Sequence, residues 1–182
     1  MNIDSQSAFD LLKKGNARFV SGTLIPKDDY AALREKLSAG QRPFAVVLCC
    51  SDSRVSPEII FDQKLGDLFV IRNAGNIVDE EVLGSIEYAV EHLETPLVVV
   101  MGHAVCGAVT ATCQGGDLPG HILDLAKRIK PSINSGCCID DNARRHAIRM
   151  ARLIEEDEIV HHVGAKVVAA FYDLQSGKVE WL

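Results

Sequence analysis

Three short apolar runs recur in the first two thirds of the chain. They are PFAVVLCC at 43–50, LFVIR at 68–72 and PLVVVMG at 96–102, and all are rich in branched side chains. Unbroken apolar runs of this length indicate strands buried on both faces. Two further β-like segments, KVVAAFYDL at 166–174 and KVEWL at 178–182, are separated by a glycine-containing turn. This ending predicts a closing hairpin.

Helical periodicity fills the intervals between these runs. In residues 6–22, for example, Ala8, Leu12 and Phe19 share one helical face. The predicted helices are 6–22, roughly 30–39, 79–93, a small-residue helix from about 103, 118–130, and a longer helix carrying Ala147, Met150, Ala151 and Ile154. The alternation predicts an α/β fold with a mostly parallel central sheet, of about four parallel strands plus a C-terminal antiparallel strand, flanked by helices.

Length and composition narrow the class of protein. A chain of 182 residues suits one domain, so we predict a single domain over 1–182. The net charge of -6 and the lack of a dense Lys/Arg run argue against nucleic acid or an anionic membrane as partner. The sequence shows neither a run of membrane-spanning length nor a secretory signal, so the cytoplasm is the expected compartment.

Six cysteines are too few and too irregularly placed for a secreted disulfide framework. In a reducing compartment, metal ligation or plain burial is the better explanation. Cys49 and Cys113 are expected to be buried in the core, and Cys137 with Cys138 to lie in a loop. His161 and His162, near the end of the long helix, cannot face one another as a metal pair, and we expect them on the surface.

Two clusters of reactive side chains follow the first and third predicted strands. Cys50-Ser51-Asp52-Ser53-Arg54 follows one strand, and His103 to Cys106 follows the other. Because ligands bind beyond the carboxyl ends of parallel strands, two thiols and an imidazole are expected at one edge of the sheet. If the next helix begins at about His103, then His103 and Cys106 project from its first turn onto one face.

Two Cys and one His suit tetrahedral Zn²⁺ and leave a fourth position for water, which is the arrangement of a catalytic site. Taken alone, each motif is weak evidence for a metal site, because a Cys after an apolar strand is more commonly a small buried hydrophobe. Asp52 and Arg54 could likewise form an ordinary exposed ion pair of little energetic value. The joint placement at two strand ends favours one catalytic zinc ion per chain.

The motifs also resemble a known family. CSDSRV at 50–55, GDLFVIRNAGN at 66–76, GSIEYAV at 84–90 and GHAVCGAV at 102–109 are similar to those of the β-class carbonic anhydrases. The similarity extends from about residue 8 to YDLQSGKVE near the C-terminus. It implies hydration of CO₂ to bicarbonate and a proton by a zinc-bound hydroxide, with Cys50, His103 and Cys106 as zinc ligands.

The resemblance further implies two states for Asp52. Asp52 either pairs with Arg54 and leaves zinc open to water, or binds zinc as a fourth ligand in a closed site. Two alternatives remain at this stage: a carbonyl sulfide or carbon disulfide hydrolase with the same ligands, and a non-catalytic zinc module that Asp52 closes permanently. The family also implies a homodimer or a dimer-based tetramer, with the N-terminal helix at 6–22 packed on the partner subunit.

Overall fold

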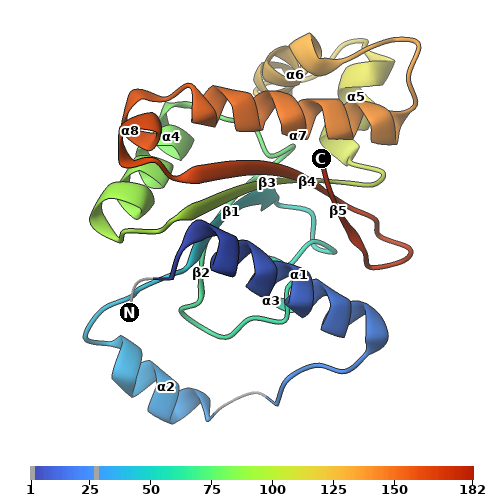
Figure 1. The fold of residues 1–182 in the computed structure, drawn as a ribbon. Helices are drawn as coiled ribbons and strands as arrows, with labels where there is room; N and C mark the ends of the chain where they lie inside the picture. Colours follow the sequence, from blue (N-terminus) through green and yellow to red (C-terminus); the bar gives the residue numbers. More distant parts are fainter. Residues whose placement is uncertain (1–2, 27–28) are drawn as a thin grey trace.

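A computed structural model describes residues 3–26 and 29–182 of the chain. Five strands form one sheet in the order β2-β1-β3-β4-β5 (Figure 1). The strands are β1 (Ala45–Cys50), β2 (Leu68–Asn73), β3 (Leu97–His103), β4 (Lys166–Tyr172) and β5 (Val179–Trp181). The first four are parallel, and β5 pairs antiparallel with β4. The predicted α/β sheet is confirmed.

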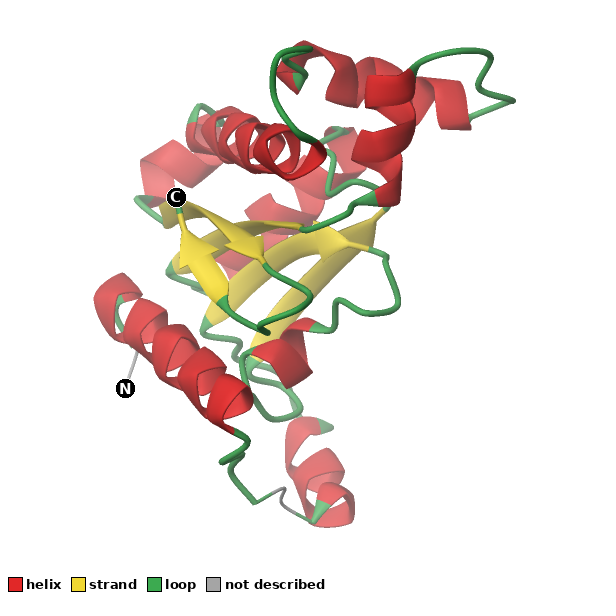
Figure 2. Ribbon diagram, turned by 90° about the vertical axis from the view of Figure 1, so that its right-hand side faces the viewer, coloured by secondary structure: helices red, strands yellow, loops and turns green. Residues whose placement is uncertain are grey.

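Helices cover both faces of the sheet (Figure 2). On one face, Val46, Val98 and Ala169 pack against α4, α7 and α8. On the other face, Val47, Val99 and Met101 pack against α1 and α3. The helices are α1 (Ser5–Ser21), α2 (Tyr30–Leu37), α3 (Pro57–Ile60), α4 (Glu80–Glu87), α5 (Gly107–Gln114), α6 (Ile122–Ile129), α7 (Ile139–Glu155) and α8 (Glu158–Val163), with a π-helical turn η1 (Tyr88–His92) and a 3₁₀ turn η2 (Lys130–Ser132).

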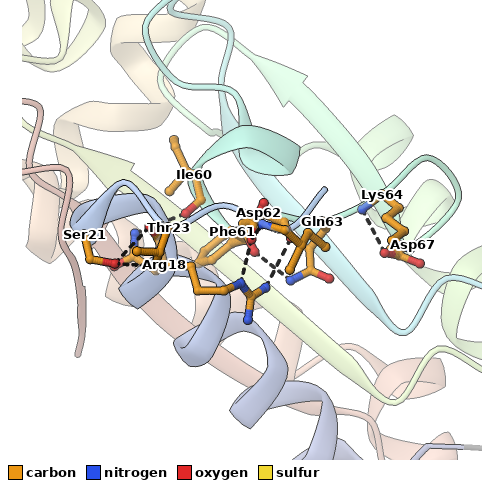
Figure 3. Close-up of polar contacts among 11 residues, drawn as sticks. Arg18, Ser21, Thr23, Ile60, Phe61, Asp62, Gln63, Lys64 and Asp67 are labelled. Carbon is orange, nitrogen blue, oxygen red and sulfur yellow. Dashed lines mark hydrogen bonds and ion pairs between the residues drawn. The ribbon is translucent and has the colours of Figure 1, made fainter. Parts of the chain in front are cut away.

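The N-terminal helix α1 packs against its own chain. Ala8 and Leu12 are fully buried beneath the sheet, and the Asn16 amide donates to the backbone of Ile60 and Gly177. Near its C-terminus, Arg18 Nε donates to the buried Asp62 carboxylate at 2.6 Å, as Figure 3 shows. The helix therefore has an intramolecular partner, and its packing on a second subunit stays a prediction.

The helices differ from the sequence prediction in two places. The short helix α3 was not expected, and it begins at Pro57, whose fixed φ suits the first helical turn. The predicted long helix is two helices, because α7 ends at Glu155 and Asp157 caps a new helix by accepting from the Ile159 and Val160 amides. His161 and His162 therefore belong to α8, where both are exposed as expected.

Within residues 3–26 and 29–182, none of the helices combines the length and the apolar character that crossing a lipid bilayer requires.

Candidate metal centre

Three potential metal ligands meet where the strands end. Cys50 is the last residue of β1 and His103 is the last residue of β3, and these two strands are neighbours in the sheet. Cys106 follows at the N-cap of α5. The ligand atoms of the three side chains lie within 4.8 Å of one another, and all three residues are buried. The sequence prediction that two strand ends bring this group together is confirmed.

The imidazole of His103 is oriented for metal binding. Its Nδ1 donates to the Ala104 carbonyl at 2.9 Å, so Nε2 carries the lone pair. Nε2 is buried and has no hydrogen-bond partner in the part of the chain that the structure describes. Leaving a buried polar atom unpaired is costly, and a bound cation removes that cost. A buried acceptor beside two thiols has the donor chemistry that Zn²⁺ prefers.

The two thiols are held in an environment that favours thiolate at Cys50. A hydrogen bond with the Cys106 thiol lowers the pKa of Cys50 against the opposing effect of burial, and contacts with His103 and the Gly75 N–H lower this pKa further. The same contact and burial raise the pKa of Cys106. Zinc is bound by thiolates, so metal binding must release a proton from this pair.

Asp52 is held by Arg54 beside the metal centre. Arg54 Nε donates to Asp52 Oδ1 at 2.9 Å and Arg54 Nη2 donates to Oδ2 at 2.7 Å, a two-pronged pair. The Arg54 guanidinium holds the pKa of Asp52 well below its usual range, so the carboxylate is ionised at neutral pH. Asp52 therefore makes the pair with Arg54 on which one of its two expected states depends.

Arg72, which sequence reasoning did not single out, fixes the segment that joins Cys50 to Asp52. Its Nε donates to the Cys50 carbonyl at 3.1 Å, and its Nη2 donates to the Asp52 carbonyl at 2.7 Å. The parallel register places Arg72 opposite Cys49, so its guanidinium lies close to the carbonyls of Cys50 and Asp52. A cation at the end of a strand that pairs with the ligand-bearing strand was the available signal.

A second unforeseen residue, His146 of α7, supports the turn beside Cys50. Gly75 N donates to Cys50 Sγ at 3.4 Å, and His146 Nε2 donates to the Gly75 carbonyl at 2.9 Å. The Ser132 hydroxyl lies 2.9 Å from His146 Nδ1. Gly75 has φ +79, and a Cβ there would come within 2.8 Å of Ile129. A lone His on the apolar face of a helix was the only signal in the sequence.

The expectation that a helix begins at about His103 is wrong. His103 ends β3, and α5 begins at Gly107, so a turn separates the two ligands. Within it Val105 has φ +54, a left-handed conformation that is uncommon for a β-branched residue. The Val105 N–H donates to Asp140 Oδ1 at 2.8 Å. A carboxylate on α7 therefore holds the turn that positions Cys106.

The other cysteines lie outside this group. Cys49 is fully buried, and burial raises the pKa of its thiol to about 12, so it is a core residue as predicted. Cys113 lies in α5 but is only partly buried. Cys138 is exposed and caps α7, with Cys137 beside it in the preceding loop. The fold and the site thus define an α/β protein with a buried Cys–His–Cys group that could hold a metal ion at the edge of its parallel sheet.

Comparison with known proteins identifies the family. The sequence profile described as "Carbonic anhydrase" matches residues 45–179. The chain is 42% identical to "Carbonic anhydrase 2" of Mycobacterium tuberculosis, over 97% of this chain and 92% of that protein. It is 50% identical to a carbonic anhydrase of Mycolicibacterium smegmatis, over 74% of this chain and 68% of that protein. The chain belongs to the β-class carbonic anhydrase family, and it is a carbonic anhydrase.

Solved structures of the class agree with this fold. One of the tetrameric β-carbonic anhydrases from the ascomycete Sordaria macrospora superimposes with a TM-score of 0.74 at 26% identity, and the match covers 84% of this chain and 89% of that one. The five-stranded mixed sheet flanked by helices is therefore the architecture shared with this class.

Proposed function

We propose that this chain catalyses the reversible hydration of CO₂ to bicarbonate and a proton, with one Zn²⁺ held by Cys50, His103 and Cys106. The observation that carries the proposal is the buried Nε2 of His103, which has no hydrogen-bond partner among the described residues. His103 belongs to a group in which one ligand atom from each of three residues lies within 4.8 Å of the other two. When bound, zinc lowers the pKa of a coordinated water far enough to supply the nucleophile near neutral pH.

The remaining roles belong to residues around the ligands. Arg54 holds the Asp52 carboxylate through two hydrogen bonds, which would keep this carboxylate from acting as a further ligand of the ion. Arg72 and Gly75 hold the backbone and the sulfur of Cys50 in place. A permanently closed, non-catalytic zinc module needs Asp52 on the metal, and the pair with Arg54 counts against it.

The pH dependence of hydration tests the thiolate ligand set. Cys50 and Cys106 together bring two negative charges to the ion, so a water bound there is expected to be less acidic than in an all-histidine site. Hydration should therefore rise from about pH 7 to about pH 8.5. Zinc content and stopped-flow CO₂ hydration, measured on one purified sample, test whether the chain binds zinc and whether hydration rises with pH.

Each outcome of that experiment has a definite meaning. About one zinc per chain with faster hydration at the higher pH supports the proposal. A rate that stays flat between about pH 6 and pH 9 counts against the thiolate-ligated mechanism. Full zinc occupancy without hydration contradicts the proposed substrate, and sulfide release from carbonyl sulfide then tests the hydrolase alternative.

We also propose a homodimer or a dimer-based tetramer, supported by the tetrameric relatives from Sordaria macrospora. Light scattering coupled to gel filtration measures the assembly directly, and a monomer at micromolar concentration contradicts it. Part of the exposed surface of α1, which includes Leu11 and Val20, is the apolar surface offered for such a contact. The cytoplasmic location and the single domain over 1–182 stay predictions from the sequence.

A further inference from the structure

An open cavity of about 420 Å³ lies between the 3₁₀ turn η2 and α7. Its volume falls in the range of about 300–1,000 Å³ that is usual for small-molecule sites. The lining residues are Pro131, Ser132, Arg145, Ile148, Arg149 and Arg152. None of them is a metal ligand or a neighbour of Asp52, so the cavity is separate from the metal centre.

Three arginines give this cavity its character. Arg145, Arg149 and Arg152 are spaced by four and three residues, so they share one face of α7. The lining contains no carboxylate. Among the described residues, no ion pair is recorded for these three, whereas Arg144 on another face of α7 pairs with Glu180 and Asp141. Like charges at this spacing repel one another, and a bound anion removes that repulsion.

The cavity also has ordered walls. Arg145 Nε donates to the Ser132 carbonyl at 3.4 Å, which ties the first guanidinium to η2. The Ser132 hydroxyl is engaged with His146, so the available donors of the site are guanidinium N–H groups. Arg149 is only partly exposed, between Arg145 and Arg152 on the helix. Positive charge is thus concentrated in one hollow of a chain whose net charge is -6.

We propose that this cavity is a binding site for a phosphate oxyanion, either inorganic phosphate or the phosphate group of a small phosphomonoester. Guanidinium groups match phosphate oxygens with paired N–H donors, which makes several arginines the preferred phosphate receptor. Pro131 and Ile148 supply apolar surface beside the guanidiniums for the organic part of a phosphomonoester. The site is too small for nucleic acid, whose binding needs a longer track of cations.

Calorimetric titration of the zinc-loaded protein tests the proposal. Inorganic phosphate and glycerol 2-phosphate are titrated separately at about pH 7.5 and constant ionic strength, because salt screens exposed charges. At least one of the two should bind one site per chain with a Kd of about 1 mM or lower. Tighter binding of glycerol 2-phosphate assigns the site to a phosphomonoester, and equal or weaker binding assigns it to free phosphate.

Variants locate the bound anion. Arg149→Gln should weaken binding about tenfold or more, and Arg149→Lys, which keeps the charge without the fork, should be intermediate. Arg152→Gln serves as a second variant of the same cluster. The matched control is Lys178→Gln, which removes one positive charge from the exposed hairpin loop on the α1 side of the sheet and should change Kd less than about twofold.

Two results overturn the proposal. One is the absence of saturable binding of either probe with a Kd of about 1 mM or lower. The other is binding that Arg149→Gln and Arg152→Gln leave unchanged, since an anion on the metal or elsewhere would behave so. Circular dichroism and zinc content of each variant confirm that the fold and the metal centre are intact before the Kd values are compared.

Discussion

The Arg54 guanidinium donates to both carboxylate oxygens of Asp52, at 2.9 Å and 2.7 Å. The backbone N–H of Arg54 donates a third hydrogen bond, to Asp52 Oδ1. The Arg54 side chain is about half exposed, whereas the Asp52 side chain is mostly buried. The guanidinium therefore reaches inward from solvent and turns the carboxylate to itself. If zinc binds at Cys50 as we propose, we expect this pair to keep Asp52 from competing for the metal.

Arg54→Ala is expected to free the Asp52 carboxylate to occupy the fourth position on zinc. CO₂ hydration should fall by roughly tenfold or more, while zinc stays near one per chain. Stopped-flow hydration and metal analysis measure the two quantities. Lys127→Ala, which breaks the exposed pair with Asp124, is the matched control and should change neither. Loss of zinc from Arg54→Ala would mean that Arg54 is mainly structural.

His146→Leu is expected to weaken zinc binding about 10–100-fold, the usual effect of removing a hydrogen-bonding residue behind the ligands. The variant loses the bond to the Gly75 carbonyl, and Gly75 in turn positions its N–H on Cys50 Sγ. Competition with a chelator measures the affinity. His146→Gln, which retains an amide donor, should recover part of it. Equal zinc affinity in the wild type and in folded His146→Leu contradicts the positioning role.

The sequence alone predicted the three candidate metal ligands but not the residues that support them. Cys50, His103 and Cys106 were predicted because strand ends are legible as apolar runs and parallel strands bring their ends together. His146 and Gly75 are 71 residues apart, and Asp140 and Val105 are 35 apart. No local pattern joins such pairs. Their contacts depend on how α7 packs over the sheet, which periodicity shows only as a buried face.

The same limit explains the errors in the boundaries. The stretch after β3 is rich in small residues and its pattern predicts a continuous helix from His103, yet Val105 adopts a left-handed φ and its N–H donates to Asp140 on α7. The apolar periodicity also predicted one long helix that continued past Asp157. That side chain accepts from two backbone amides and starts α8, which is the local N-cap chemistry that an apolar stripe conceals.

Acid should destabilise the protein partly through His146. Burial lowers the pKa of this imidazole to about 4 from an ordinary 6.5, so the unfolded chain takes up the proton first. The contribution of His146 to the free energy of unfolding is therefore fully present above pH 6.5. It decreases as the pH falls toward 4, by about 3 kcal/mol across that window. Urea unfolding at several pH values measures it. His146→Gln, which cannot titrate, should show a shallower decline, and parallel curves contradict the assignment.

Val105→Gly tests the strain in the turn between His103 and Cys106. Val105 is 62% exposed at φ +54, so the substitution gives up little buried surface and removes a conformational cost of about 1–2 kcal/mol. The greater freedom of glycine in the unfolded chain offsets about 1 kcal/mol. We expect the free energy of unfolding to rise by about 0.5 kcal/mol.

Val163→Gly is the matched control, because Val163 is also exposed but closes the ordinary helix α8. There the same change should lower the free energy of unfolding by about 0.5 kcal/mol. Urea denaturation of both variants measures the difference in sign. If Val105→Gly destabilises the protein as much as Val163→Gly does, the left-handed turn carries no strain. The contact between the Val105 N–H and Asp140 would then be a consequence of the turn rather than its support.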